Sequence, residues 1–172
     1  IKEEFSYITQ DENIIDDALK YVDMLEYKNK DLYYLSLGQK QRIMIAEVLA
    51  KKPQYIIFDE PTTMIDSIGK VKIYKLIKKL KDEGYTIICI TNLADEILLA
   101  DRTIILNNGE IVEQIEKTEL VEKSNVFEKY EIRIPTLLEI LVKLKSNGIE
   151  LDNNDVLTVD SLVKELCVKM KK

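Results

Sequence analysis

Apolar residues recur at helical spacing in the first part of the chain. From Ile14 to Leu25 they alternate with acids in a pattern that predicts an amphipathic helix over residues 12–26. A second helix is expected over residues 38–51, and Pro53 ends it because the residue before a proline avoids the helical conformation. The first fifty residues are therefore expected to be mainly helical.

Two short apolar runs follow, YIIF at residues 55–58 and TIICI at residues 86–90. Continuous apolar runs of this length predict strands that are buried on both faces of a parallel sheet. Between them, residues 69–84 carry apolar side chains on one helical face and lysines elsewhere, and Gly84 marks the end of the helix. A strand, a helix and a second strand predict a βαβ unit, which belongs to the α/β class.

The pattern of the next segment is typical of a short helix and a hairpin. Residues 93–101 predict the helix. Residues 102–114 predict two strands joined by Asn-Gly, which is a strong signal for a two-residue hairpin turn.

The pattern changes again after about residue 116, and from about residue 132 it predicts two helices separated by a polar turn. Thr136 and Glu139 have the spacing of a capping box, so they are expected to start the first of these helices. Thr158 is expected to start the second. The end of the chain is therefore predicted to be a small helical module.

Composition narrows the class of protein. The 172 residues are 46% hydrophobic and 33% charged with few Gly and Pro, which is typical of a folded globular chain. A net charge of −6 and the lack of a basic patch argue against nucleic acid as a ligand. The two cysteines form neither a disulfide framework nor a metal-binding pattern. The apolar runs are shorter than the roughly 20 residues of a membrane span, so a membrane role would require a partner.

Two adjacent acids, Asp59 and Glu60, end the first predicted strand. Ligands of open α/β sheets bind at the carboxyl ends of the strands, and an acid there can hold Mg²⁺ through its water shell. Asp59 suits that role, whereas Glu60 would face a terminal phosphate, where it could orient a water molecule and take its proton. Two solvated loop acids would give the same pattern, so these two residues alone do not decide the function.

The segment LSLGQ also has two interpretations. Ser36 and Gln39 have the spacing of an ordinary capping box, which could start any helix. A helix start with a free hydroxyl and exposed backbone N–H groups is also a site that attracts phosphate, because the helix dipole is positive there. Both interpretations can hold at once.

The motifs taken together are much more specific than each alone. LSLGQKQR, a helix, YIIFDEPT, a short loop with MID and a strand with a polar end follow one another at fixed intervals. This order resembles the nucleotide-binding subunits of ABC transporters, in which the signature LSGGQ precedes the Walker B strand, the D-loop and the switch-histidine strand. The resemblance covers roughly residues 1–115.

The resemblance implies a role for each matching residue. The signature closes on the γ-phosphate of an ATP molecule held by the opposite subunit, Asp59 serves Mg²⁺ through water, and Glu60 is the catalytic glutamate. Asp66, in TMIDS, matches the D-loop aspartate that acts across the dimer. The signature residues here are Ser36, Leu37, Gly38 and Gln39.

The implied fold is α/β: part of a P-loop NTPase core with a parallel sheet, part of the helical signature subdomain, and a small C-terminal helical module. We expect the helical subdomain at residues 1–50, the ATPase core at 51–115, and a linker with a dimerisation-type module at 116–172. The tail resembles the C-terminal extension of the ATPases of energy-coupling-factor importers, which take up vitamins and cobalt or nickel.

That resemblance also implies partners and a location. We expect a second ABC ATPase subunit, identical or different, a transmembrane coupling subunit and a substrate-binding membrane subunit. The chain is expected to act at the cytoplasmic face of the bacterial cell membrane as a peripheral subunit.

Three departures from the family pattern bear on activity. The phosphate-binding loop, Gly-x-x-x-x-Gly-Lys followed by Ser or Thr, does not occur, and the chain begins without Met. It is therefore expected to be the second half of a subunit that by itself binds ATP poorly. Asn92 stands at the switch-histidine position in a chain with no His. Leu37 replaces the first signature glycine, and its side chain and backbone preferences are expected to reduce close approach to phosphate.

An active but slow ATPase is the interpretation we favour, because Glu60 is retained. A catalytically impaired companion in a heterodimer is the main alternative, and Asn92 and Leu37 motivate it. A soluble ABC ATPase of DNA repair or translation is less favoured, because the chain is acidic and has no basic arm or coiled-coil heptads.

Overall fold

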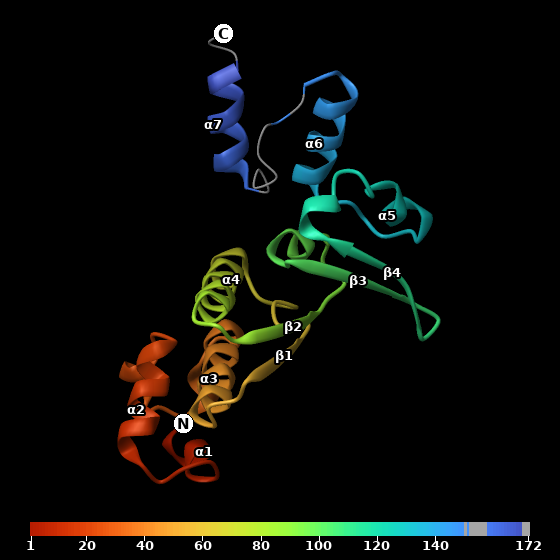
Figure 1. Cartoon of the computed structure of the whole chain (residues 1–172). Coiled ribbons are helices and arrows are strands. Elements are labelled where there is room, and N and C mark those ends of the chain that lie inside the picture. The colour runs from red at the N-terminus through yellow and green to blue at the C-terminus, as the bar shows by residue number, and fades with distance from the viewer. Residues whose placement is uncertain (150, 152–157, 170–172) are drawn as a thin grey trace. The chain divides into compact units, whose positions relative to one another are not determined.

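A computed structural model describes residues 1–149, 151 and 158–169 of the chain. The chain consists of two compact units, Ile1–Thr91 and Asn92–Lys172 (Figure 1). Each has its own apolar core. The division of the chain at residues 50 and 115 by function remains a prediction.

The first unit begins with helices α1 (Lys2–Ser6) and α2 (Glu12–Tyr21). The predicted helix over residues 12–26 is wrong in its extent, because α2 ends at Tyr21. Asp23 adopts a positive φ of 56°, and the N–H of Met24 then donates to the carbonyl of Leu19 at 2.8 Å. This closure is a Schellman-type motif, which ends a helix even where the apolar spacing continues.

Two 3₁₀ helices, η1 (Leu25–Tyr27) and η2 (Leu32–Tyr34), lead from α2 to helix α3 (Leu37–Ala50). The prediction of α3 is confirmed within one residue at each end.

The core beneath these helices contains side chains from every part of the first unit, including Phe5, Leu19, Met24, Ile43, Ile73 and Leu80.

A cluster of ion pairs joins α1, α2 and the end of η1. Glu12 pairs with both Lys2 and Lys28, and Lys28 also pairs with Asp16. Hydrogen bonds from Lys2 and then from Lys28 lower the pKa of the Glu12 carboxyl group from 4.5 to about 2. The charged form of Glu12 is therefore favoured in the folded state.

Strand β1 (Tyr55–Asp59), helix α4 (Ser67–Asp82) and strand β2 (Thr86–Ile90) form the predicted βαβ unit. The strands pair in parallel, with Asp59 opposite Ile90 at their carboxyl ends. Gly84 has a φ of 93° just after α4, which confirms it as the helix stop.

One contact ties α2 to α4 across the first unit. The hydroxyl of Tyr21 donates to Oε2 of Glu83 at 2.7 Å, and Nζ of Lys79 lies 3.6 Å from the centre of the Tyr21 ring. Burial and this hydrogen bond raise the pKa of the Tyr21 hydroxyl.

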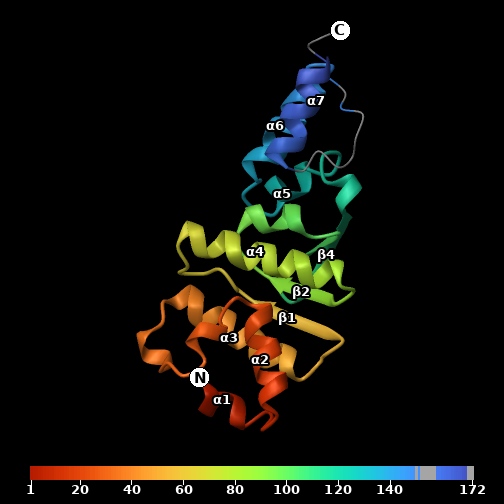
Figure 2. The ribbon, with the colours of Figure 1, turned by 90° about the vertical axis from the view of Figure 1, so that its left-hand side faces the viewer.

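The prediction that both strands are buried on two faces is wrong for this structure. Ile56 and Phe58 are buried, but Tyr55 and Ile57 on the other face of β1 are 66% and 64% exposed. Strand β2 has no fully buried residue. The physical reason is that α3 and α4 lie on the same side of the strand pair, so only one face is covered within the first unit (Figures 1 and 2).

The second unit opens with a 3₁₀ helix, η3 (Ala94–Leu99), and the antiparallel strands β3 (Arg102–Asn107) and β4 (Glu110–Glu116). Asn108 and Gly109 both have positive φ, as a type I′ hairpin turn requires, so the Asn-Gly prediction is confirmed. A shift of register after Ile105 marks a bulge in this hairpin.

After the hairpin, the described part of the second unit contains the helices η4 (Lys117–Glu119), α5 (Asn125–Lys129), α6 (Thr136–Ser146) and α7 (Val159–Lys169). Their shared core with the hairpin includes Ile105, Ile115, Phe127, Leu138 and Leu162.

Of the two helix caps predicted in this unit, the one at Thr158 is correct and the one at Thr136 is not. Thr158 is confirmed, because its Oγ1 accepts the N–H of Ser161 at 3.2 Å. The capping box at Thr136 is wrong, because Pro135 occupies the cap position and Thr136 is already helical. Glu139 pairs instead with Lys143 at 2.8 Å, one turn further along α6. Among the described residues, none of the helices is long and apolar enough to cross a membrane.

Candidate functional site

The signature turn, Leu35–Gln39, is shaped by hydrogen bonds between its own residues. Ser36 is the N-cap of α3, and its Oγ accepts the N–H of Gln39 at 3.3 Å. Oε1 of Gln39 in turn accepts the N–H of Ser36 at 2.9 Å, which completes the predicted capping box. Leu35 is buried and anchors the turn, while Ser36 stays exposed at the positive end of the helix dipole.

Leu37 fits this turn without backbone strain. It is the first helical residue of α3, and it does not have a positive φ. The expected conflict between Leu37 and a glycine-only conformation is therefore wrong. Its side chain is 49% exposed, so its remaining effect is to place an apolar group beside the helix start.

The strand exit, Asp59–Thr63, has a different geometry. Asp59 is the last residue of β1, and the next residue, Glu60, has a left-handed φ of 46°. The N–H of Glu60 donates to the carbonyl of Ile90 at 2.8 Å, which fixes this bend against the end of β2. Thr63 donates from Oγ1 to Oε2 of Glu60 at 3.1 Å. Non-glycine residues adopt such a conformation uncommonly, and in this chain the helix stop at Asp23 and the hairpin turn at Asn108 have it as well.

The chemistry of this exit fits a magnesium ion held mainly by water and phosphate. Both Asp59 and Glu60 are exposed at the carboxyl end of a parallel strand. The described part of the chain contains no group of three or more His, Cys, Asp or Glu residues that could hold a metal by themselves. Mg²⁺ in nucleotide sites commonly takes one or two carboxylates and keeps several waters.

Asp66, the predicted D-loop aspartate, starts the helix that follows the exit. Asp66 is the N-cap of α4, and its Oδ1 accepts the N–H of Gly69 at 2.7 Å. A Cβ placed on Gly38 would lie 3.7 Å from Cα of Gly69, so the first turns of α3 and α4 lie side by side. The structure therefore brings Ser36–Gln39 and Asp66 together in the first unit.

Asn92 is the first residue of the second unit, two positions after the last residue of β2. Its role at the switch position, like the roles of the other site residues, remains a prediction. Thr63, Ile65 and Gly69 contribute to the geometry and were missed by sequence reasoning. No local sequence signal links Ile65 to Gly69, because Ile65 lies before the N-cap of α4 and the helical i, i+4 spacing does not apply to it.

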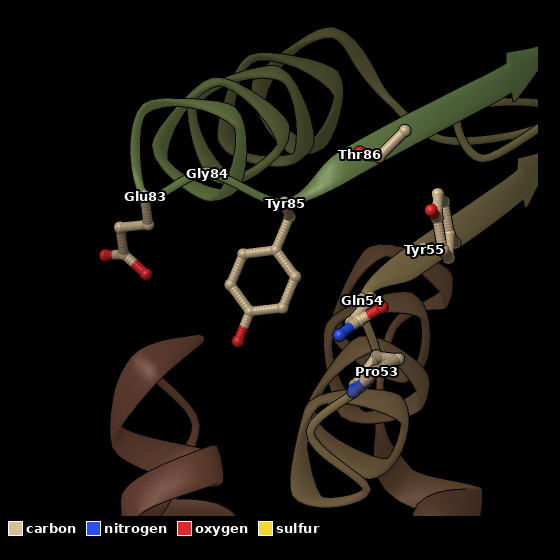
Figure 3. A pocket seen from close by; sticks show the side chains of 7 residues that line it. All are labelled: Pro53, Gln54, Tyr55, Glu83, Gly84, Tyr85 and Thr86. Carbon is tan, nitrogen blue, oxygen red and sulfur yellow. The ribbon is translucent and has the colours of Figure 1, made fainter.

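A cavity of about 490 Å³ lies at the opposite end of the strand pair (Figure 3). Its lining comes from the segments that precede β1 and β2 and from the first residues of those strands, including Gln54 and Tyr85. Ligands of parallel sheets bind at the carboxyl ends of the strands, so this cavity is separate from the candidate site.

Comparisons with known proteins agree with this geometry. Residues 1–63 match the family model described as ABC transporter. Energy-coupling factor transporter ATP-binding protein EcfA1 of Caldanaerobacter subterraneus is 39% identical over 154 residues, or 89% of this chain and 55% of that protein. Its counterpart in Bacillus subtilis is 35% identical over 153 residues, or 88% of this chain and 54% of that protein. The chain spans about half the length of these curated relatives.

The chain is also similar to solved structures of ATP-binding proteins of ABC transporters. The structure of cbiO1 from Clostridium perfringens, part of the ABC transporter complex cbiONQ, has a TM-score of 0.60 and 32% identity over 74% of this chain and 52% of that one. A dimeric ATP-binding cassette bound to ADP and Pi has a TM-score of 0.52 and 33% identity, covering 58% of this chain and 44% of that one.

The βαβ unit, the capped signature turn and the acidic strand exit thus define an ABC-type nucleotide-binding fold. The chain belongs to the ABC transporter family of ATPases. Within that family, the curated relatives that it matches are ATP-binding proteins of energy-coupling factor transporters.

Proposed function

We propose that the chain is part of the ATP-hydrolysing subunit of an energy-coupling-factor-type ABC importer, which drives uptake of a vitamin or a transition-metal ion. The observation that carries this proposal is the strained exit of β1, where Glu60 is fixed against β2 directly after Asp59. The names of the relatives support the transporter class.

In this proposal each residue has a defined task. Asp59 accepts hydrogen bonds from the water shell of Mg²⁺, which supplies positive charge beside the phosphates when it is bound. Glu60 accepts a proton from the attacking water, and its hydrogen bond from Thr63 holds the carboxylate in place. The exposed start of α3 donates N–H groups to the γ-phosphate of an ATP molecule on a partner subunit.

The proposed partners follow from the relatives. One solved relative is part of the complex cbiONQ, and another is a dimeric cassette with ADP and Pi. We infer that this chain acts in a dimer of ATPase subunits on the cytoplasmic face of the membrane. The dimer would bind a transmembrane coupling subunit and a substrate-binding membrane subunit.

The test uses a loop-fused protein, which we define as this chain preceded by an ABC transporter segment, taken from a relative, that carries the phosphate-binding loop. Asp59→Asn should lower its Mg²⁺-dependent ATP turnover by about 100-fold and raise the Mg²⁺ concentration required, because a charged partner of the metal shell is lost. Asp82→Asn, on the exposed end of α4, is the matched control and should leave both unchanged. Equal turnover in the two variants would rule out the metal assignment.

A catalytically impaired companion subunit is the second candidate, and Asn92 favours it. Asn can donate a hydrogen bond but cannot carry a proton as a histidine does. The comparison of Asn92→His with the parent loop-fused protein separates the two candidates. A rise in turnover of about 100-fold supports the companion, whereas unchanged turnover supports the active subunit.

A further inference from the structure

A single methyl group lies between two glycines at the starts of α3 and α4. A Cβ added to Gly69 would lie 2.4 Å from Cγ2 of Ile65, which is closer than real Cβ atoms come to other heavy atoms. A Cβ added to Gly38 would lie 3.4 Å from the same methyl group. Gly69 therefore leaves no room for a side chain, whereas Gly38 nearly has room for one.

Ile65 has little freedom to make way. Its side chain is only 7% exposed, and a β-branched side chain is stiff about its first torsion. Its neighbour Asp66 is held in place by capping the N–H of Gly69 at 2.7 Å. A side chain at Gly69 would thus have to displace Ile65, whose Cγ2 also lies beside Gly38 at the start of α3.

We propose that Gly69 is a positioning residue that keeps the signature turn and the D-loop aspartate in a fixed position relative to each other. The proposal rests on the proposed function, in which both motifs face ATP held by a partner subunit. Its structural basis is the position of Ile65 Cγ2, which lies close to the places that a Cβ would take at both Gly38 and Gly69.

The proposal predicts a selective kinetic effect. Gly69→Ala in the loop-fused protein should lower kcat by about 10- to 100-fold, because misplacement by about 1 Å can cost that much. The KM for ATP should change by less than about threefold, because phosphate-binding loops supply most of the contacts that hold a nucleotide. Lys72→Ala, on the exposed face of α4, is the matched control and should retain the parental kcat.

The rescue variant is Ile65→Leu. This change keeps the side-chain volume but moves the branch away from Cβ, so it removes the methyl group that a Cβ at position 69 would meet. The double variant with Gly69→Ala should recover at least half of the parental kcat. A loss of stability at Gly69 that does not come from the clash with Ile65 would not be rescued by this exchange.

A second readout does not depend on ATP turnover. In the chain alone, Gly69→Ala should shift the backbone amide NMR resonances of Gly38 and Gln39, and the double variant should return them towards the parental positions. If Gly69→Ala does not fold, recovery of the fold in the double variant supports the proposal.

Unchanged Gly38 and Gln39 resonances in Gly69→Ala, or a double variant without recovery, would overturn the positioning role. If the parent loop-fused protein hydrolyses no ATP, the proposed function fails. The amide resonances still decide whether Gly69 positions the signature turn.

Discussion

The signature turn and the strand exit lie in the same unit, but different interactions shape them. The signature turn is closed by two reciprocal hydrogen bonds between Ser36 and Gln39, three residues apart. The strand exit depends on a bond from Glu60 to Ile90, thirty positions away in the sequence, and on a left-handed residue. The signature turn is therefore a local structure, whereas the strand exit forms only when β1 and β2 have paired.

The two segments also differ in the expected energetic cost of their backbone conformations. A capping box stabilises its helix, so the signature turn can present N–H groups without strain. A left-handed glutamate destabilises the fold by roughly 1–3 kcal/mol. A glycine at position 60 would adopt this positive φ more easily than glutamate does.

The largest expected effect comes from removing the support of the strand exit. Phe58→Ala should lower the free energy of unfolding of the first unit by about 3–5 kcal/mol, because Phe58 is buried beneath β1. Ile57→Ala, on the exposed face of the same strand, should cost less than about 1 kcal/mol. Urea unfolding of the whole chain measures both values. Similar losses for the two variants would contradict the one-sided burial of β1.

A smaller effect is expected at the signature turn. Ser36→Ala should lower the free energy of unfolding by about 1 kcal/mol, because the N–H of Gln39 loses its acceptor. Ser36→Gly should cost only a few tenths of a kcal/mol. Thermal unfolding followed by circular dichroism compares the two variants. A Ser36→Ala variant as stable as the parent would mean that the capping box does not hold the turn.

A glycine in the strand exit should raise the stability of the fold, whereas a glycine at Ser36 should lower it slightly. Glu60→Gly should raise the free energy of unfolding by about 0.5–1 kcal/mol, because relief of the steric cost of a positive φ outweighs the loss of the exposed hydrogen bond from Thr63. Glu26→Gly serves as a control in the same unit and should not stabilise. Urea unfolding checks the sign, and a loss of stability in Glu60→Gly would argue against a strained exit.

The smallest expected effect is on the helices that precede the signature turn. The pKa of Glu12 is lowered to about 2, so its ion pairs stabilise the fold above the ordinary pKa of 4.5. This contribution is lost as the pH falls from about 4.5 through about 2. Glu12→Gln should therefore flatten the acid dependence of stability in that range, whereas Glu3→Gln should not. An unchanged pH profile in Glu12→Gln would mean that the ion pairs of Glu12 do not contribute to the acid dependence of stability.

The features that sequence reasoning predicted correctly are mostly local. The capping box at Ser36, the stop at Gly84 and the hairpin at Asn108 and Gly109 each depend on residues within one turn. The order of the motifs then placed both acids at the end of β1.

The errors arose where tertiary contacts decide the structure. The apolar spacing continues past Tyr21, but the buried contact of Met24 with the end of α2 closes the helix earlier. Thr136 has the right spacing for a cap, yet the backbone of Pro135 takes that place. The space between Gly38 and Gly69 depends on how two helices meet, which no local pattern encodes.

The most direct test of the central claim is the ATP turnover of the loop-fused protein with Glu60→Gln. Glutamine keeps the size of the side chain but cannot accept a proton from water, so turnover should fall by at least about 100-fold while ATP still binds. Glu26→Gln should hydrolyse ATP at the parental rate. Turnover in Glu60→Gln equal to that of Glu26→Gln would contradict the assignment of Glu60 as the catalytic base.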